Sequence, residues 1–330
     1  MKKRADGRYE RVVTVNGKRK TFYGTSIKEV NRKIYLYKED ISNGKPFKTV
    51  AWEWKDRHMD RLSYGSQRAY TAPFLRLVDY FGDKPIDSIT LQSVQQFFAT
   101  LGLSYKSASL HKTVLNQIFN YAILNLNMVI SNPCDRLKLD GRLPRSHRSA
   151  ATPEQEQAIL DTTANEFILA PLIYYTGLRC GEALALRYGD VDYEKNTITV
   201  KQAVVHHGNK PVVSPPKTPN AIRTVPLLPQ LKELIGQGSP TQYIIGGDKP
   251  ITKSALAKRW LRWETDHGVE VDRHSIRHTY ATKLYEAGVG IKSAQSLLGH
   301  ADAQTTLNIY THLNQNHVTE AAEKLGEVFK

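Results

Sequence analysis

Cysteine is scarce in this sequence, because only Cys134 and Cys180 occur among its 330 residues. A small secreted fold held together by disulfides is therefore excluded. The sequence also shows no signal peptide and no apolar run long enough to span a bilayer. These absences predict a protein of the reducing cytoplasm, and the length allows two or three domains with cores of their own.

Acidic residues are also few relative to basic ones. The chain has 32 Asp and Glu against 46 Lys and Arg, which gives a formal charge of +14 and a pI near 9.6. Such a balance indicates a polyanionic partner, and nucleic acid is the first candidate. Residues 1–48 hold fourteen of the basic side chains and five acidic ones, so about two thirds of the net charge lies there. The alternative is a solvated basic surface without a partner.

The N-terminal segment, residues 1–44, predicts a small sheet with one helix. Strands are expected at residues 8–15 and 18–23, joined by an Asn-Gly turn, the strongest short hairpin signal. A helix is expected from about residue 25 to 41. The candidate DNA-contacting residues of this segment are Lys2, Lys3, Arg4, Arg8, Arg11, Lys18, Arg19 and Lys20. The alternative is a generic ββα module whose basic residues serve solubility.

Residues 49–140 show helical periodicity with few strand signals, which predicts a domain of four helices. The clearest helix is expected from about Tyr105 to Leu126. Its buried stripe should be Leu110, Val114, Leu115, Ile118, Phe119 and Ala122, which recur at helical spacing. Residues 141–150 are polar and basic and contain a proline, as expected of a linker between domains.

A further domain, residues 151–330, is expected to begin at Thr152. The sequence Thr152-Pro-Glu-Gln155 supplies an N-cap, a proline at the first helical position and a capping-box partner. Residues 196–206, 210–213 and 223–227 predict a three-stranded antiparallel sheet between helical segments. The fold class predicted for the whole chain is therefore multidomain α+β, with a mainly helical C-terminal domain.

Four separated motifs in this domain carry the chemistry. They are Tyr175-Thr-Gly-Leu-Arg179-Cys-Gly-Glu182, His274-Ser-Ile-Arg277, Leu298-Gly-His300 and Ile309-Tyr310-Thr-His312. Two arginines can pair with the oxygens of a phosphodiester, since the guanidinium fork holds two oxygens and does not deprotonate. Histidines can donate to phosphate or accept a proton. A tyrosine hydroxyl, with a free pKa near ~10, can then act as the nucleophile if a base or cations assist it.

The order and spacing of these motifs resemble the tyrosine recombinases, also called the phage integrase family. Arg277 lies 23 residues before His300, and Tyr310 lies 10 residues after it, close to the family's intervals. The resemblance implies that the catalytic residues are Arg179, Lys217, His274, Arg277, His300 and the nucleophile Tyr310. It further implies a 3′-phosphotyrosyl intermediate, a Holliday junction and no cofactor, and the sequence shows neither a metal-spaced carboxylate cluster nor a Walker-type loop.

The resemblance also assigns roles to individual side chains. Glu182 is expected to orient its neighbours without touching phosphate. His274 is the better candidate for the base, and His300 for a phosphate donor. Lys217 matches the hairpin lysine that protonates the leaving 5′ oxygen, although Lys210 is close by. The simpler readings are a structural ion pair of each arginine with Glu182 or Asp190, a solvated lysine, and purely structural roles for His278 and His312.

The same resemblance implies the domain roles and the partners. Residues 1–44 look like an arm-type DNA-binding domain and residues 49–140 like a core-binding domain, followed by the catalytic domain. The expected partners are double-stranded DNA with core and arm sites, a homotetramer on that DNA, a small excisionase and a DNA-bending protein. The basic N-terminal module favours an integrase of a mobile element or prophage, working at the bacterial nucleoid, over a chromosome-dimer resolvase.

Two other classes of protein are compatible with these motifs. A type IB topoisomerase shares the catalytic set and would relax supercoils without paired sites. A catalytically silent DNA-binding regulator would lack some of the catalytic residues, and no such gap is evident in the sequence.

Beyond Tyr310, the apolar positions Val318, Ala321, Ala322, Leu325 and Phe329 recur at helical spacing. They predict a terminal helix that packs on a neighbouring subunit or on its own domain.

Overall fold

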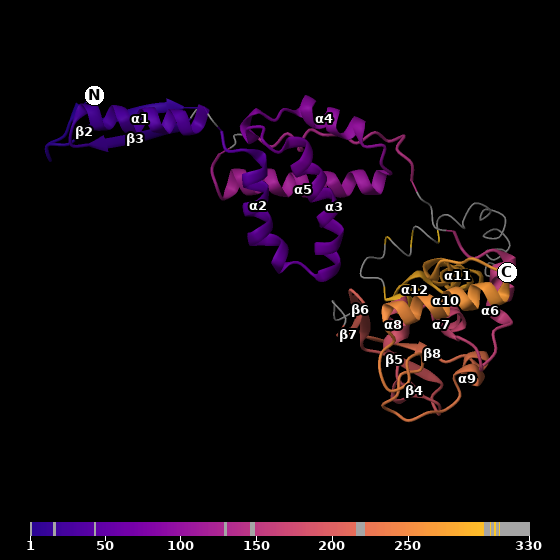
Figure 1. The fold of residues 1–330 in the computed structure, drawn as a ribbon. Helices are drawn as coiled ribbons and strands as arrows, with labels where there is room; N and C mark the ends of the chain where they lie inside the picture. Colours follow the sequence, from indigo (N-terminus) through magenta and orange to yellow (C-terminus); the bar gives the residue numbers. More distant parts are fainter. Residues whose placement is uncertain are drawn as a thin grey trace, which may run out of the picture. The chain divides into compact units, whose positions relative to one another are not determined.

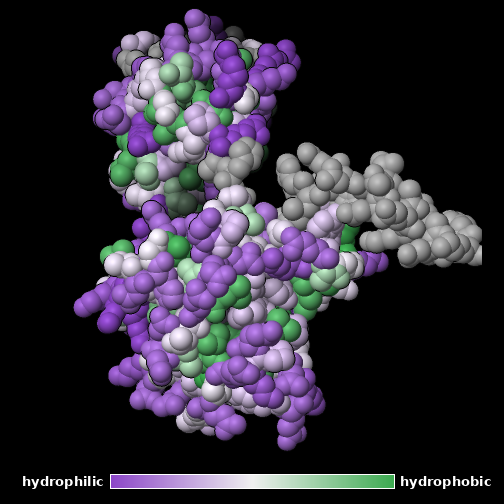
Figure 2. Space-filling model, turned by 90° about the vertical axis from the view of Figure 1, so that its right-hand side faces the viewer, coloured by the Kyte–Doolittle hydropathy of each residue, from purple (hydrophilic) through white to green (hydrophobic). Residues whose placement is uncertain are grey.

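The computed structural model describes residues 2–15, 18–42, 44–128, 131–145, 149–215 and 222–299, together with 304, 307 and 310. The chain divides into two compact units, Met1–Ser146 and His147–Lys330. This division falls inside the expected linker at 141–150. No helix in the described part of the chain is long and apolar enough to cross a membrane. On the face drawn in Figure 2, hydrophilic side chains prevail and hydrophobic ones form small separate patches.

The first unit begins with a three-stranded antiparallel sheet and a helix (Figure 1). The elements are β1 Lys2–Lys3, β2 Tyr9–Val15, β3 Lys18–Gly24 and α1 Ile27–Ser42. The predicted hairpin is confirmed, since β2 pairs with β3 from Tyr9↔Gly24 to Val15↔Lys18, while its two turn residues lie outside the described part. The short β1 was not predicted, because two residues carry no periodic signal.

The two faces of this sheet differ. On one face Phe22 packs with Val30 and Ile34 of α1, which gives the module its own small core. Because neighbouring residues of a strand point to opposite faces, the strand register assigns each side chain to the helix-covered face or to the open one. The open face carries Lys2, Glu10, Val12, Thr14, Arg19, Thr21 and Tyr23.

The second part of this unit is the expected helical bundle (Figure 1). Its described helices are α2 Phe47–His58, α3 Tyr64–Phe81, α4 Leu91–Thr100 and α5 Tyr105–Leu124, with 3-10 turns η1 Met59–Arg61 and η2 Ile86–Ser88. The predicted long helix is confirmed and ends two residues early. Its stripe is buried as expected except at Leu110, which is only half-buried, while His111 next to it is buried. The imidazole of His111, whose Nδ1 lies 2.8 Å from Ser107 O, takes the buried position that was expected for Leu110.

The second unit is mainly helical with two small antiparallel sheets. Its helices are α6 Pro153–Leu160, α7 Leu169–Thr176, α8 Cys180–Ala185, α9 Pro229–Ile235, α10 Lys253–His267, α11 Arg273–Glu286 and α12 Ile291–Leu298. Figure 1 shows α7, α8 and α10 to α12 gathered at one end of this unit and α9 with the strands β4, β5 and β8 at the other. The predicted capping box is confirmed, because Thr152 caps α6 and Gln155 bonds back to it.

The strands pair differently from the prediction. A three-stranded sheet is present, but its order is β4 Val191–Asp192, β5 Thr197–Val200 and β8 Arg223–Pro226. The expected strand 196–206 breaks after Val200, and β6 Ala203–His207 pairs only with β7 Lys210–Ser214. The cause is tertiary: β6 packs on α8, and the hairpin turn bonds to the start of α10, where Ser254 N donates to Asn209 Oδ1 at 2.8 Å.

Candidate active site

Arg179 is placed by a sharp break between two helices. Helix α7 ends at Gly177, which has a left-handed φ of +64°, and α8 begins with Arg179 at its N-cap. A Cβ at Gly177 would lie 2.1 Å from Cδ1 of Tyr280, so both the backbone and the space require glycine. One helix therefore stops at Gly177, and a new one starts at Arg179.

Arg277 lies on α11, which packs directly against α7. It is 8% exposed, and its Nη1 donates to the carbonyl oxygen of Gly177 at 2.6 Å. The turn that presents Arg179 is therefore itself held by Arg277. Arg277 is thus linked to the backbone two residues before Arg179, although the two arginines are far apart in the sequence.

The end of α12 holds three guanidinium groups. Three consecutive carbonyls there each accept a hydrogen bond from a different arginine. The pairs are Arg223 Nε with Leu297 O at 2.8 Å, Arg277 Nη2 with Leu298 O at 2.6 Å, and Arg179 Nη2 with Gly299 O at 2.8 Å. The last carbonyls of a helix lack partners within it and carry its partial negative charge, so cations are favoured there.

Glu182 is the carboxylate at the centre of this arginine cluster, and it is 5% exposed. Its Oε1 accepts from Arg179 Nη1 at 2.8 Å, and its Oε2 accepts from the Arg179 backbone N at 2.9 Å and from Arg223 Nη2 at 2.8 Å. Burial alone would raise its pKa, but the hydrogen bonds and charges of Arg223 and then Arg179 hold the pKa below its usual value. Glu182 is therefore ionised at neutral pH.

The cluster has more positive than negative charge. Three guanidiniums, Arg179, Arg223 and Arg277, surround the one carboxylate of Glu182. Burial, and next the charge of Arg179, lower the pKa of Arg277 to about 9, which still leaves it protonated at neutral pH. An excess of cations in a partly desolvated place favours a bound anion. The arrangement can therefore seat a phosphodiester.

The structural ion pair considered for Arg179 does exist. It joins Arg179 to Glu182, while Asp190 pairs instead with Lys201 at 2.5 Å. The side chain of Arg179 nevertheless stays 42% exposed. An arginine fixed by a buried carboxylate but open to solvent on its other side is preorganised to meet a ligand.

His274 lies on the first turn of α11, one turn before Arg277. Its imidazole is half exposed, with Nδ1 3.5 Å from Oδ1 of Asp272, the N-cap of the helix. His278, one turn beyond, is half-buried. Of the other expected catalytic groups, His300 and Lys217 lie outside the described residues, as does His312. Gly299, which precedes His300 in the chain, is described. Lys217 lies in the chain between the described strands β7 and β8. Lys210 opens β7 and is exposed.

Tyr310 is buried at 6% exposure in a small cluster from α11 and α12. Its hydroxyl donates to the carbonyl oxygen of Val289 at 3.1 Å, and its ring meets the edge of Tyr285 at a centroid distance of 5.1 Å. Burial raises the pKa of the Tyr310 phenol. The expected nucleophile is thus held as a neutral hydroxyl bonded to a carbonyl. Tyr280 is buried in the same cluster, and Tyr285 is half-buried.

Arg223 is the member of the cluster that lies outside the four motifs. In the sequence it is only the first residue of a predicted strand. The signal was present, because strand alternation puts Arg223 on the same buried face as Val225. An arginine at an inward position of a strand requires a partner, and here the partner is Glu182.

The basic residues of the N-terminal module lie in different environments. Arg4 bonds to Glu10 at 3.1 Å and Arg8 to Asp6 at 3.2 Å, both at the exposed surface. Arg11 reaches Asn31 of α1 at 3.4 Å. The remaining residues of the set, Lys2, Lys3, Lys18, Arg19 and Lys20, lie within the strands β1 and β3.

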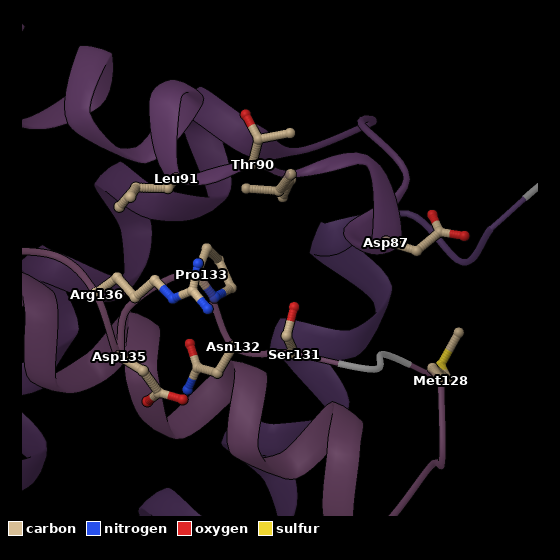
Figure 3. Close-up of a pocket in the computed structure, with 10 residues that line it drawn as sticks. Asp87, Thr90, Leu91, Met128, Ser131, Asn132, Pro133, Asp135 and Arg136 are labelled. Carbon is tan, nitrogen blue, oxygen red and sulfur yellow. The ribbon is translucent and has the colours of Figure 1, made fainter. Parts of the chain in front are cut away.

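A pocket in the helical bundle lies apart from these groups. It is lined by residues of η2 and of the turns after α5, including Thr90, Asn132 and Arg136 (Figure 3). The Asn132 amide is already bonded, since it donates to Asn116 Oδ1 at 2.7 Å and Asn120 Oδ1 at 3.0 Å. Asn132 therefore serves the packing of the bundle. Among the described residues, no group of three or more His, Cys, Asp or Glu could hold a metal ion.

The fold and the site define a class of protein: a multidomain α+β protein whose mainly helical second unit holds a buried arginine cluster suited to an anion. The chain belongs to the phage integrase family, whose pattern matches residues 150–317. It is 30% identical to a XerC-like tyrosine recombinase of Caldanaerobacter subterraneus subsp. tengcongensis, over 95% of this chain and 93% of the relative. It is 29% identical to the ICEBs1 integrase of Bacillus subtilis, over 76% and 74% of the two chains.

A solved structure has the same fold. The Tn1549 transposon integrase in complex with transposon right-end DNA matches with a TM-score of 0.69 at 21% identity, over 85% of this chain and 99% of that chain. The resemblance noted in the sequence and the expected fold class are confirmed. The protein is a tyrosine recombinase, an enzyme that cleaves and rejoins DNA at specific sites.

Proposed function

We propose that this recombinase integrates and excises a mobile element or prophage in the bacterial cytoplasm through a 3′-phosphotyrosyl intermediate and a Holliday junction. The observation that carries the proposal is the arginine cluster: three guanidiniums around one ionised Glu182, with Arg179 still open to solvent. The similarity to the ICEBs1 integrase and to a prophage integrase of Lactococcus lactis supports the mobile-element assignment.

In the proposed reaction Arg179 and Arg277 bind the non-bridging oxygens of the scissile phosphate, where charge grows in the transition state. The Tyr310 oxygen attacks phosphorus and gives its proton to a base, for which His274 is the candidate. The bond from phosphorus to the 5′ oxygen breaks, and that oxygen takes a proton from Lys217. Attack by a new 5′ hydroxyl on the phosphotyrosine reverses these steps and rejoins the strand, with His300 as a phosphate donor.

Tyr310 must change its environment before it attacks. Its hydroxyl now donates to Val289 O, and its ring is enclosed by side chains such as Tyr285. Giving up one such neutral hydrogen bond costs about 0.5–1.5 kcal/mol, which binding to DNA can supply. We infer that the protein without DNA holds its nucleophile in a resting position.

We further propose DNA-binding roles for the first unit. Residues 1–44 would bind arm sites with the open face of the sheet, which carries Lys2 and Arg19 together with Tyr23. Residues 49–140 would clamp the core site, and residues 141–150 would link them to the catalytic domain 151–330. A lambda integrase tetramer bound to a Holliday junction has the same fold at a TM-score of 0.56, which supports a homotetramer on DNA. An excisionase and a DNA-bending protein complete the expected partners.

The test is covalent capture on nicked duplex DNA that spans the junction of the element. The nick releases a short strand after cleavage, so the adduct accumulates. We expect a denaturation-resistant adduct with wild type, mapped to Tyr310 on a 3′ phosphate, and none with Tyr310→Phe. An adduct of equal yield with Tyr310→Phe would refute the assignment of the nucleophile. Relaxation of supercoiled DNA that lacks the paired sites would favour a topoisomerase over a recombinase.

A further inference from the structure

Arg223 connects parts of the catalytic unit that come from three places in the sequence. It is the first residue of β8, and its side chain is only 4% exposed. Its Nη2 donates to Glu182 Oε2 and its Nε to Leu297 O, both at 2.8 Å. One side chain thus joins a strand, the start of α8 and the end of α12.

The guanidinium also lies directly against the turn that follows α12. Gly299 has a left-handed φ of +62°, and a Cβ added there would lie 2.7 Å from Nη1 of Arg223 and 2.9 Å from its Cζ. Glycine is therefore needed at this place partly because Arg223 fills the adjacent space. The next residue in the chain is His300, so Arg223 borders the turn that leads into a proposed phosphate donor.

The strand position of Arg223 adds a third connection. Arg223 pairs with Val200 of β5, which anchors the beginning of β8 in the sheet. Residues 216–221, which include Lys217, lead into this strand. Arg223 thus begins the described strand six residues after Lys217 in the sequence.

Burial of this ion pair is not explained by stability alone. Taking two charges out of water is costly, and well-packed apolar residues often stabilise a core as much or more. The contacts of Arg223 instead concern groups of the proposed reaction: Glu182 fixes Arg179, and the end of α12 holds Arg179 and Arg277. Because the Arg223 side chain is sealed from solvent, it acts on these groups rather than on DNA.

We propose that Arg223 is a positioning residue for DNA cleavage, which orients Arg179 through Glu182 and holds the end of α12 in place. This inference rests on the proposed function. Loss of outer groups that orient catalytic ones costs roughly 10–100-fold in activity in comparable metal sites. We expect a similar loss of the single-turnover cleavage rate for Arg223→Gln, with core-site DNA affinity changed less than about threefold.

The experiment is a double-mutant cycle in the full-length protein. Arg223→Gln, Glu182→Gln and the double variant are compared on the nicked substrate at saturating protein, with DNA affinity and thermal unfolding measured for each. If Arg223 acts through Glu182, the double variant is about as slow as the slower single variant. If the two losses multiply, or if Arg223→Gln cleaves at the wild-type rate, the inference is wrong.

Two further variants separate positioning from folding. Arg223→Lys keeps the charge but cannot donate to Glu182 and Leu297 O through the same planar fork, so it should fold and bind DNA yet cleave slowly. Arg259→Gln is the control, because its Nη1 also donates to a carbonyl, Ile245 O at 3.1 Å, away from the cluster. It should cleave normally, and a cleavage loss equal to that of Arg223→Lys would refute a specific role. A wild type that forms no adduct would refute the proposed function itself.

Discussion

Replacing Glu182 by Gln tests whether the carboxylate balances the arginine cluster. Glu182 accepts three hydrogen bonds from Arg179 and Arg223, at 2.8–2.9 Å. Glutamine keeps one acceptor oxygen but turns an NH2 group toward guanidiniums. Removing one partner of a buried ion pair costs about 3–5 kcal/mol. We expect Glu182→Gln to lower the free energy of unfolding of the catalytic unit by this amount, or its Tm by roughly 6–20 °C.

The measurement is scanning calorimetry, in which the transition of the catalytic unit is compared between variants. Glu264→Gln is the matched control, because Glu264 Oε1 accepts a single backbone bond from Val271 N at 2.9 Å. The amide oxygen of glutamine can still accept this bond, so Glu264→Gln should lower the free energy of unfolding by at most about 1 kcal/mol. Equal Tm losses for the two variants would show that the arginine cluster does not depend on the charge of Glu182.

The loss of stability caused by Glu182→Gln should also depend on pH. The folded pKa of Glu182 is below its usual value, so the carboxylate stabilises the fold above the unfolded pKa, about 4.3. This contribution disappears as the pH falls through the lower, folded pKa. The gap in Tm between wild type and Glu182→Gln should therefore be full at pH 7 and narrow below about pH 4. A gap that stays constant down to pH 3 would contradict the ion-pair explanation.

Two other predictions concern the arm module and the helix break. Arg19→Gln, on the open face of the sheet, should weaken arm-site DNA binding and reduce the salt slope by about one, whereas Lys20→Gln should change it less, because the Lys20 amine lies 4.1 Å above the Tyr37 ring of α1. Fluorescence anisotropy across salt concentrations measures both, and equal effects would contradict the face assignment. Gly177→Ala should lower the free energy of unfolding by about 2–4 kcal/mol, since overpacking adds to left-handed strain. A urea midpoint equal to that of wild type would refute this.

Local signals predicted the fold where local interactions decide it. The Asn-Gly hairpin and the capping box at Thr152 each depend on residues within a few positions, and both were confirmed as elements. The strand at 196–206 was mispredicted, because its break after Val200 depends on α8 and α10, which pack there from elsewhere in the sequence. The residues of a strand carry no periodic signal for its contacts with elements that are far away in the sequence.

The sequence predicted which kinds of side chain form the site, but only part of how these side chains are arranged in space. The spacing of the motifs indicated Arg179 and Arg277, and the structure brings both to Glu182. Arg223 was missed because a strand arginine is usually solvated, and only its partners show otherwise. The resting position of Tyr310 could not be predicted either, since the bond to Val289 O depends on how helices pack, not on the motif around the tyrosine.

The three carbonyls at the end of α12 have a consequence for how the site can move. They are consecutive residues, two at the end of the helix and one, Gly299, in the left-handed turn that closes it, so a single short stretch of backbone sets the relative positions of three guanidiniums. A displacement of α12 carries all three cations together, and a one-residue change in its length would misalign every pair. The positions of the three cations of the recombinase are therefore coupled through the end of one helix.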